Sequence, residues 1–199
     1  MLASGAGTNL QALLDDPHVG PSVVLVVSDR VGALALDRAR VHGVRTVPLL
    51  PAHYGSREGF DRAMRLLLEE EAIEYVLLAG FMRILGPEVV GAYRDHILNV
   101  HPSLLPAFAG AHAVRDALAW GVAVTGATVH LVDEELDHGP IVVQEAVAVA
   151  PDDDEASLHA RIQEVEHRIY PRATRWMIER RLKVEGRRVH VLDTLDADG

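Results

Sequence analysis

Residues 22–50, SVVLVVSDRVGALALDRARVHGVRTVPLL, hold a strand pattern, a helical pattern and a second strand pattern in succession. The first, SVVLVVSD, is a continuous run rich in β-branched residues, which predicts a strand over 22–29. The helical pattern that follows ends at Gly43, and VRTVPLL predicts a strand over 44–50. A strand, a helix and a strand in this order are typical of a parallel sheet.

The alternation continues over SREGFDRAMRLLLEEEA (56–72), EYVLLAGF (74–81), PEVVGAYRD (87–95) and HILNV (96–100). Ser56 is a suitable N-cap for the first of these helices, and Pro87 stands at a favoured first position of the second. The EYVLLAGF run is apolar almost throughout, as expected for a strand covered on both faces. The pattern predicts an α/β fold with a doubly wound, mostly parallel sheet of the Rossmann-like kind.

The pattern changes after residue 121. VTGATVHLV and PIVVQEAVAVA predict C-terminal antiparallel strands, joined by the acidic loop DEELDHG. A helix is expected over 154–182, with Pro171 kinking or breaking it. The tail over 183–199 predicts a short hairpin and an acidic end. We expect one domain, 1–199, with halves at 1–100 and 101–182 followed by this tail.

Composition narrows the classes of protein to consider. The 199 residues include 29 acidic and 19 basic side chains, a formal net charge of −10, and no cysteine. The acidic balance argues against a nucleic-acid-binding surface, and the lack of cysteine excludes disulfides and thiolate metal sites. The first residues lack the basic start and apolar core of a signal peptide, and no apolar stretch reaches the roughly 18 residues of a membrane span. We expect a cytoplasmic protein that binds neither nucleic acid nor membrane.

A glycine-containing turn, SGAGTNLQAL (4–13), opens a helix at Thr8 or Asn9. Glycine lets the backbone approach a ligand closely, and the amides at a helix start favour phosphate. The third glycine of a dinucleotide-binding turn is replaced by Leu10, and no G-K-[ST] of a nucleoside-triphosphate loop follows. The alternative is a turn without a ligand. The strand before this turn is only MLAS (1–4), which is short for a central strand, and a stable protein is expected to carry several more residues there.

Polar side chains end the strand over 96–100. In an extended chain Asn99 and His101 point to the same face, and Pro102 biases His101 away from the helical region. This layout suits polar chemistry at a strand end, and the alternative is a capping or core-edge role. Asp137 lies in the acidic loop that precedes a strand, for which a solvated turn is the alternative. Arg83, in GFMRILGP, stands among apolar residues just past a strand.

Two other kinds of catalytic site lack their signatures. No H-E-x-x-H pattern is present, and four histidines, at 101, 112, 130 and 138, would converge only through tertiary folding. No G-x-S-x-G elbow of a serine hydrolase occurs. We therefore expect no metal in the site.

Six segments together resemble the phosphoribosylglycinamide formyltransferase family over residues 2–182: SGAGTNLQAL, SREGFDR, LAGFMRIL, NVHPSLLPAFAG, VTGATVHLVDEELDHGPIVVQEAV and EHRIYP. The resemblance implies a formyltransferase of de novo purine biosynthesis. Such an enzyme transfers the formyl group of 10-formyltetrahydrofolate to the amine of glycinamide ribonucleotide. These two small molecules are the partners implied, and a homodimer is left open.

The resemblance also implies roles for single residues. The catalytic residues would be Asn99, His101 and Asp137. The ribonucleotide would be bound by Gly7, Thr8, Asn9 and Glu166. The folate would be bound by Arg57, Met82, Arg83, Ile84, Leu85, Asp133, Glu134, Glu135 and Leu136.

The sequence departs from the family pattern at a shorter first strand and at Ala109, where proline often precedes Gly110. The main alternative is formyltetrahydrofolate deformylase, a hydrolase that carries an N-terminal regulatory domain. Methionyl-tRNA formyltransferase has an additional C-terminal domain and needs a tRNA surface, which an acidic chain of this length does not suit. A non-catalytic nucleotide-binding module would need neither His101 nor Asp137, and a nicotinamide oxidoreductase is disfavoured by the missing third glycine.

Overall fold

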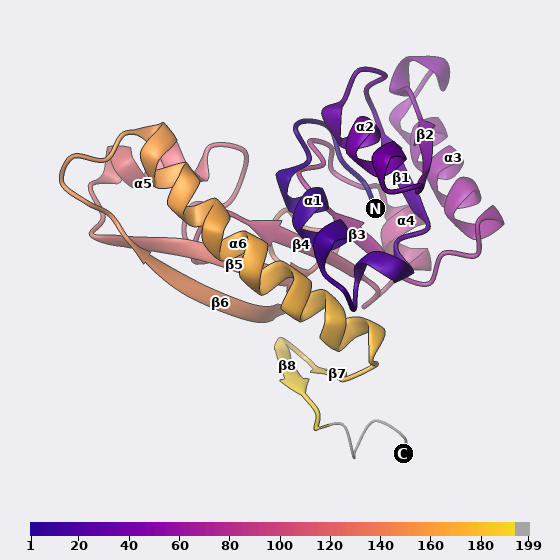
Figure 1. Ribbon diagram of the computed structural model, residues 1–199. Helices are drawn as coiled ribbons and strands as arrows, with labels where there is room; N and C mark the ends of the chain where they lie inside the picture. The colour runs from indigo at the N-terminus through magenta and orange to yellow at the C-terminus, as the bar shows by residue number, and fades with distance from the viewer. Residues whose placement is uncertain (194–199) are drawn as a thin grey trace. The chain divides into compact units, whose positions relative to one another are not determined.

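Short strands, two of which are buried, lie in the first of two units, Met1–Leu98 (Figure 1). In the computed structural model, which describes residues 1–193, β1 (Leu25–Ser28) pairs in parallel with β2 (Arg45–Pro48). All residues of β1 and of β3 (Val76–Leu78) are buried. Continuous burial explains why these strands have no alternation of polar and apolar residues.

The start of the chain lies between two of these strands. Leu2 forms parallel bridges to Val27 of β1 and to Leu78 of β3, and no longer strand is formed there. The α-amino group of Met1 donates to the carbonyl oxygen of Leu25 at 2.6 Å. Burial lowers the pKa of this amino group to about 5. The short first strand expected from MLAS is thus a segment with bridges at Leu2 alone, although the backbone of residues 1–4 forms hydrogen bonds on both sides.

Four helices accompany the strands of the first unit: α1 (Thr8–Asp15), α2 (Leu34–Val41), α3 (Arg57–Glu70) and α4 (Pro87–Ala92). The predicted ends are confirmed, since Ser56 Oγ caps α3 by accepting from Gly59 N at 3.0 Å and Pro87 is the first residue of α4. The strand expected to begin at residue 22 begins at Leu25, because Gly20–Ser22 forms a 3₁₀ turn (η1). A second 3₁₀ turn, η2, covers Pro51–His53.

The second unit, Asn99–Gly199, contains a mostly antiparallel group of strands. β4 (Ile97–His101) enters it from the first unit, where it is hydrogen-bonded to β3, and the order continues β4-β5-β6-β8-β7. β5 (Val124–Leu131) and β6 (Ile141–Ala148) are antiparallel, with a register shift between Val129 and His130. The mixture of a parallel first part and antiparallel C-terminal strands confirms the predicted fold class. The one-domain organisation with halves at 1–100 and 101–182 remains a prediction.

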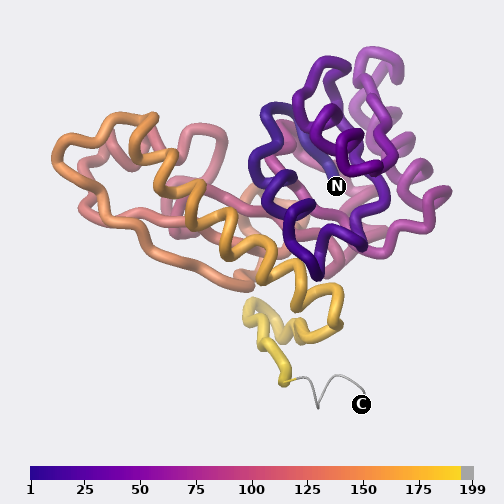
Figure 2. Tube along the Cα trace, viewed as in Figure 1, coloured from indigo at the N-terminus to yellow at the C-terminus, as the bar shows by residue number. Residues whose placement is uncertain are grey.

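The predicted C-terminal hairpin is present, and its course can be followed in Figure 2. β7 (Leu182–Glu185) and β8 (Arg188–Val191) are antiparallel, and β8 pairs with β6 at one position, Ile141 with Arg188. The acidic end expected over the last residues falls on 194–199, which lie outside the described residues. Helix α5 (Ala113–Trp120) had no counterpart in the sequence analysis.

Helix α6 (Glu155–Ile178) packs against β5 and β6 and corrects one expectation. Pro171 lies inside this helix and does not break it. Proline removes one helical hydrogen bond, at a cost of about 3 kcal/mol. Pro171 and its neighbours Ile169, Tyr170 and Ala173 are all buried, and this packing outweighs the local preference.

Candidate active site

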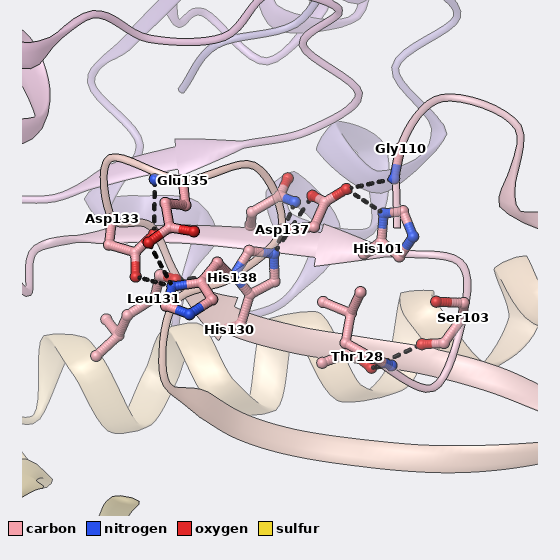
Figure 3. Close-up of polar contacts among 12 residues, drawn as sticks. His101, Ser103, Gly110, Thr128, His130, Leu131, Asp133, Glu135, Asp137 and His138 are labelled. Carbon is pink, nitrogen blue, oxygen red and sulfur yellow. Dashed lines mark hydrogen bonds and ion pairs between the residues drawn. The ribbon is translucent and has the colours of Figure 1, made fainter. Parts of the chain in front are cut away.

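The end of β4 carries His101, whose ring lies beside the Asp137 carboxylate (Figure 3). Nδ1 lies 3.4 Å from Asp137 Oδ2, and Nε2 donates to the backbone carbonyl of Phe108 at 2.9 Å. Since both neighbours are acceptors, an imidazolium satisfies them with its two N–H groups. Two of the three catalytic residues implied by the resemblance are therefore in direct contact.

Asp137 reaches His101 because of an unusual loop conformation between β5 and β6. Its φ is 51°, in the left-handed region, and its carboxylate accepts from Gly110 N at 2.7 Å. Two residues later, a Cβ at Gly139 would overlap the carbonyl oxygen of Leu131, so that only glycine fits there. The side chain of Asp137 is only 9% exposed, which shows that the solvated-turn alternative is wrong for this residue. It holds for Glu135, which is exposed.

Asn99 is fixed by a histidine that the sequence analysis did not place among the catalytic residues. Its Nδ2 donates to His130 Nε2 at 3.0 Å, and His130 Nδ1 donates to the Leu131 carbonyl at 2.8 Å. These bonds place the proton of His130 on Nδ1 and leave the ring neutral. Burial lowers the pKa of His130, which favours the same neutral form. His130 Nε2 also lies 3.8 Å from Asp137 Oδ1.

The four side chains form a buried polar cluster, which we call the β4-end cluster: Asn99, His101, His130 and Asp137. The Asn99 amide has a second N–H, and His101 carries a donor at Nε2, so the cluster can offer hydrogen bonds to an oxyanion. The signal for His130 in the sequence was weak, because a histidine in an apolar strand is typical of a core position.

In the first unit, α1 begins at Thr8, as expected, after a glycine that no other residue can replace without strain. Gly7 has φ 69°, and a Cβ there would lie 2.8 Å from Ala35 Cα. The backbone amides of Thr8 and Asn9 form the N-terminal end of this helix, where an anion is favoured.

Residues 82–85 form a second loop of the first unit for which the resemblance implies a role in binding. Contacts with three separate parts of the chain hold this loop. Ser4 Oγ accepts from Met82 N at 2.9 Å, and Arg83 Nε donates to Asp29 Oδ2 at 3.0 Å. Arg57 Nη2 donates to the Ile84 carbonyl at 3.4 Å, so the structure brings Arg57 to this loop. The apolar side chains of Met82 and Ile84 are exposed, whereas Leu85 is buried.

A buried carboxylate anchors the end of this loop. Asp61, which is 4% exposed, accepts from the amides of Gly86, Glu88 and Val89 at 2.7, 3.0 and 3.3 Å. Ser4, Asp29 and Asp61 could not be predicted as supports from the sequence, because each contact joins distant parts of the chain.

The remaining expected residues lie in the second unit. Glu166 is on α6 and is buried, and Asp133, Glu134, Glu135 and Leu136 form the loop between β5 and β6. Within residues 1–193, no three or more histidine, aspartate or glutamate side chains are placed so that they could together hold a metal ion. Over the same residues, no helix is long and apolar enough to cross a membrane.

Comparisons with known proteins identify close relatives. The sequence profile of the family described as "Formyl transferase" matches residues 1–174. Phosphoribosylglycinamide formyltransferase of Escherichia coli (strain K12) is 42% identical over 187 residues, which cover 92% of this chain and 88% of that protein. The trifunctional purine biosynthetic protein adenosine-3 of Gallus gallus is 47% identical over 176 residues, or 87% of this chain. The chain spans only 18% of that longer relative.

A solved structure has the same fold. Glycinamide ribonucleotide transformylase 1 from Symbiobacterium toebii superposes with a TM-score of 0.94 at 48% sequence identity, and the match covers 96% of this chain and 92% of that one. The corresponding enzyme of Bacillus halodurans gives a TM-score of 0.85 at 42% identity, with 89% and 93% covered.

Proposed function

This chain belongs to the formyl transferase family, and we propose that it is a phosphoribosylglycinamide formyltransferase, like its E. coli relative. The formyl group of 10-formyltetrahydrofolate is transferred to the amine of glycinamide ribonucleotide, in de novo purine biosynthesis. The observation that carries this proposal is the β4-end cluster, in which Asn99 and His101 present donors at one strand end and Asp137 lies 3.4 Å from His101. The enzyme acts on small molecules in the cytoplasm.

The chemistry follows from the residue types. The amine attacks the formyl carbon, and negative charge develops on the formyl oxygen. The second N–H of Asn99 and the Nε2–H of His101 donate to that oxygen, where such donors act most strongly in a water-poor site. Because the Phe108 carbonyl accepts from Nε2 in this structure, the formyl oxygen has to replace it there.

Asp137 contacts His101, and His130 contacts Asn99, so each of the two donors has a supporting side chain. Asp137 stabilises the imidazolium of His101 and assists transfer of the amine proton toward the departing folate nitrogen. His130 Nε2 accepts from one N–H of the Asn99 amide, which leaves the second N–H for the formyl oxygen. One C–N bond forms and one breaks, and the proton moves between the two nitrogens, so that no metal or covalent enzyme intermediate is needed.

Binding roles are proposed separately for each unit. In the first, the phosphate of the ribonucleotide binds at Gly7, Thr8 and Asn9. The apolar Met82 and Ile84, next to the Arg57 guanidinium, suit a flat ring with a carboxylate tail, as folate has. In the second, Glu166 contacts the ribonucleotide and residues 133–136 contact the folate.

The test is an assay with 10-formyltetrahydrofolate in the presence and absence of glycinamide ribonucleotide. We expect turnover that requires the ribonucleotide and yields tetrahydrofolate with formylglycinamide ribonucleotide. Release of formate without the ribonucleotide, at an equal rate, would instead identify the deformylase alternative. His101→Ala should abolish the turnover, and the matched control His53→Ala, at an exposed position far along the sequence, should retain it.

A further inference from the structure

The turn of the C-terminal hairpin contacts the loop that carries Asp137. Arg187 lies in the turn between β7 and β8, and its Nη2 donates to the backbone carbonyl of His138 at 2.6 Å. Its Nη1 donates to His138 Nε2 at 3.0 Å. One guanidinium therefore holds both the main chain and the ring of the residue that follows Asp137.

His138 also contacts the beginning of the loop. Since arginine only donates, His138 Nε2 accepts, and the proton of the neutral ring lies on Nδ1. Nδ1 donates to Asp133 Oδ2 at 2.8 Å, and Asp133 Oδ1 accepts from Glu135 N at 3.0 Å. The chain of hydrogen bonds runs from Arg187 through His138 to Asp133 and spans the loop between β5 and β6. Figure 3 shows Asp133, Glu135 and His138 at one end of this loop and Asp137 turned toward His101.

We propose that Arg187 is a positioning residue that keeps the Asp137 carboxylate directed at His101 by fixing His138. Asp137 has a left-handed backbone conformation, which is uncommon for a residue with a side chain although aspartate adopts it more readily than most. The carbonyl that Arg187 holds belongs to the peptide between residues 138 and 139, one residue beyond Asp137. Because Arg187 fixes this peptide and the His138 ring, a change in the backbone angles of Asp137 would have to break these contacts, and the guanidinium therefore opposes a movement that would turn Asp137 away. This role rests on the proposed function of Asp137 and His101.

The base of the hairpin is held independently of Arg187. Leu192 N donates to the Arg181 carbonyl at 2.8 Å, and Arg181 Nε donates to the Leu192 carbonyl at 2.7 Å. Beyond these bonds, β8 pairs with β6 only at Ile141 and Arg188. Replacing Arg187 therefore removes the contact to the loop and leaves the hairpin closed. Arg188, also exposed and adjacent in sequence, provides a control of equal charge.

The first measurement is hydrogen exchange on the protein without substrates. Arg187→Ala should speed exchange of the amides in residues 132–140 about tenfold, as expected when one or two partly exposed hydrogen bonds are lost. Arg188→Ala should leave these amides unchanged, and amides of α6 should be the same in all variants. Equal exchange in the two variants over 132–140 would overturn the proposal.

The second measurement separates positioning from general stability. Arg187→Ala should lower kcat about fivefold to tenfold while the KM for glycinamide ribonucleotide changes less than about twofold, since Asp137 acts mainly in the transition state. Arg187→Lys keeps the positive charge and a donor group on a long side chain and should recover part of the loss, whereas the shorter, uncharged side chain of Arg187→Gln should not. Faster exchange with an unchanged kcat would also overturn the proposal. If the parent protein does not turn over these substrates, the proposed function fails, and the exchange experiment still decides whether Arg187 holds the loop.

Discussion

The loop over residues 80–86 in the first unit and the loop over 132–140 in the second are supported in opposite ways. The first is held by Ser4 and Asp61, which are buried in the core of their unit. The second is held at one end by the exposed side chains of His138 and Arg187, and its buried parts are the Asp137 side chain and Gly139. A loop with core supports changes shape only when its unit unfolds. A loop with surface supports opens at a smaller cost in free energy.

The largest expected effect comes from the buried carboxylate of the second loop, Asp137. Asp137→Asn removes the charge beside His101, and we expect kcat to fall by about 10² to 10⁴ with little change in substrate binding. His101→Ala should cost at least as much, and the double variant less than the product of the two losses. Steady-state rates of the three variants provide the test. A folded Asp137→Asn protein with a kcat within about threefold of the parent would remove Asp137 from the proposed mechanism.

The next effect concerns stability and the first loop. Asp61→Ala leaves three amides near the start of α4 without their acceptor, and we expect a loss of about 2 to 4 kcal/mol in the free energy of unfolding. Asp37→Ala, which breaks an exposed ion pair with Arg40, should cost less than about 0.5 kcal/mol. Denaturant titrations of both variants give the comparison. Equal, small losses would show that the core supports of the first loop contribute little.

The third effect is a pH dependence of stability at the β4-end cluster. Burial lowers the pKa of His130, so that the unfolded chain takes up a proton before the folded one as the pH falls. The contribution of His130 to the free energy of unfolding is complete above about pH 6.5, the ordinary pKa of histidine. Below that pH it declines by at most about 1.4 kcal/mol per pH unit. The Met1 amino group, with its pKa of about 5, acts in the same direction between about pH 8 and 5.

The two contributions are separated by a variant. His130→Gln removes the histidine contribution and keeps that of Met1, so its free energy of unfolding should fall less than that of the parent between pH 6.5 and 5. Parallel slopes for the two proteins would show that His130 takes up its proton equally in both states.

The smallest effect is expected at the exposed rim of the second loop. Glu135 lies 3.9 Å from His138 Nδ1, and its side chain is 76% exposed. Glu135→Gln should change kcat less than about twofold, because solvent screens such a pair. Steady-state rates at low and high salt check this. A larger loss at low salt alone would show that surface charges, besides hydrogen bonds, hold the loop.

Much of the fold could be predicted because the parallel strands are continuous apolar runs and the helices carry local end signals such as Ser56 and Pro87. The prediction failed where packing outweighs local preference, as at Pro171 inside α6. Helix α5 was missed although its C-terminal end is marked by Gly121, in the left-handed conformation typical of such ends.

The part of the candidate site at the end of β4 was predictable only as far as spacing along one strand allows. Asn99 and His101 share a strand end, and their residue types indicate donors. The partnership of Asn99 with His130 depends on tertiary contact between two strands, which the sequence does not specify. The supports at Asp29 and Asp61 depend in the same way on contacts between distant segments.

The Phe108 carbonyl accepts a hydrogen bond from His101 Nε2. It therefore competes, within the protein itself, with any ligand oxygen that needs the same donor. Phe108 has φ 53°, a conformation that costs free energy for a residue with a side chain, so the contact is held against backbone strain. A ligand that needs Nε2 binds only to the fraction of molecules in which this carbonyl has moved away. If that fraction were about one in ten, the apparent Kd of an oxyanion mimic would be about tenfold weaker than its intrinsic value. The apparent affinity for such a mimic therefore depends both on how often the Phe108 carbonyl has moved away and on the strength of the two donors.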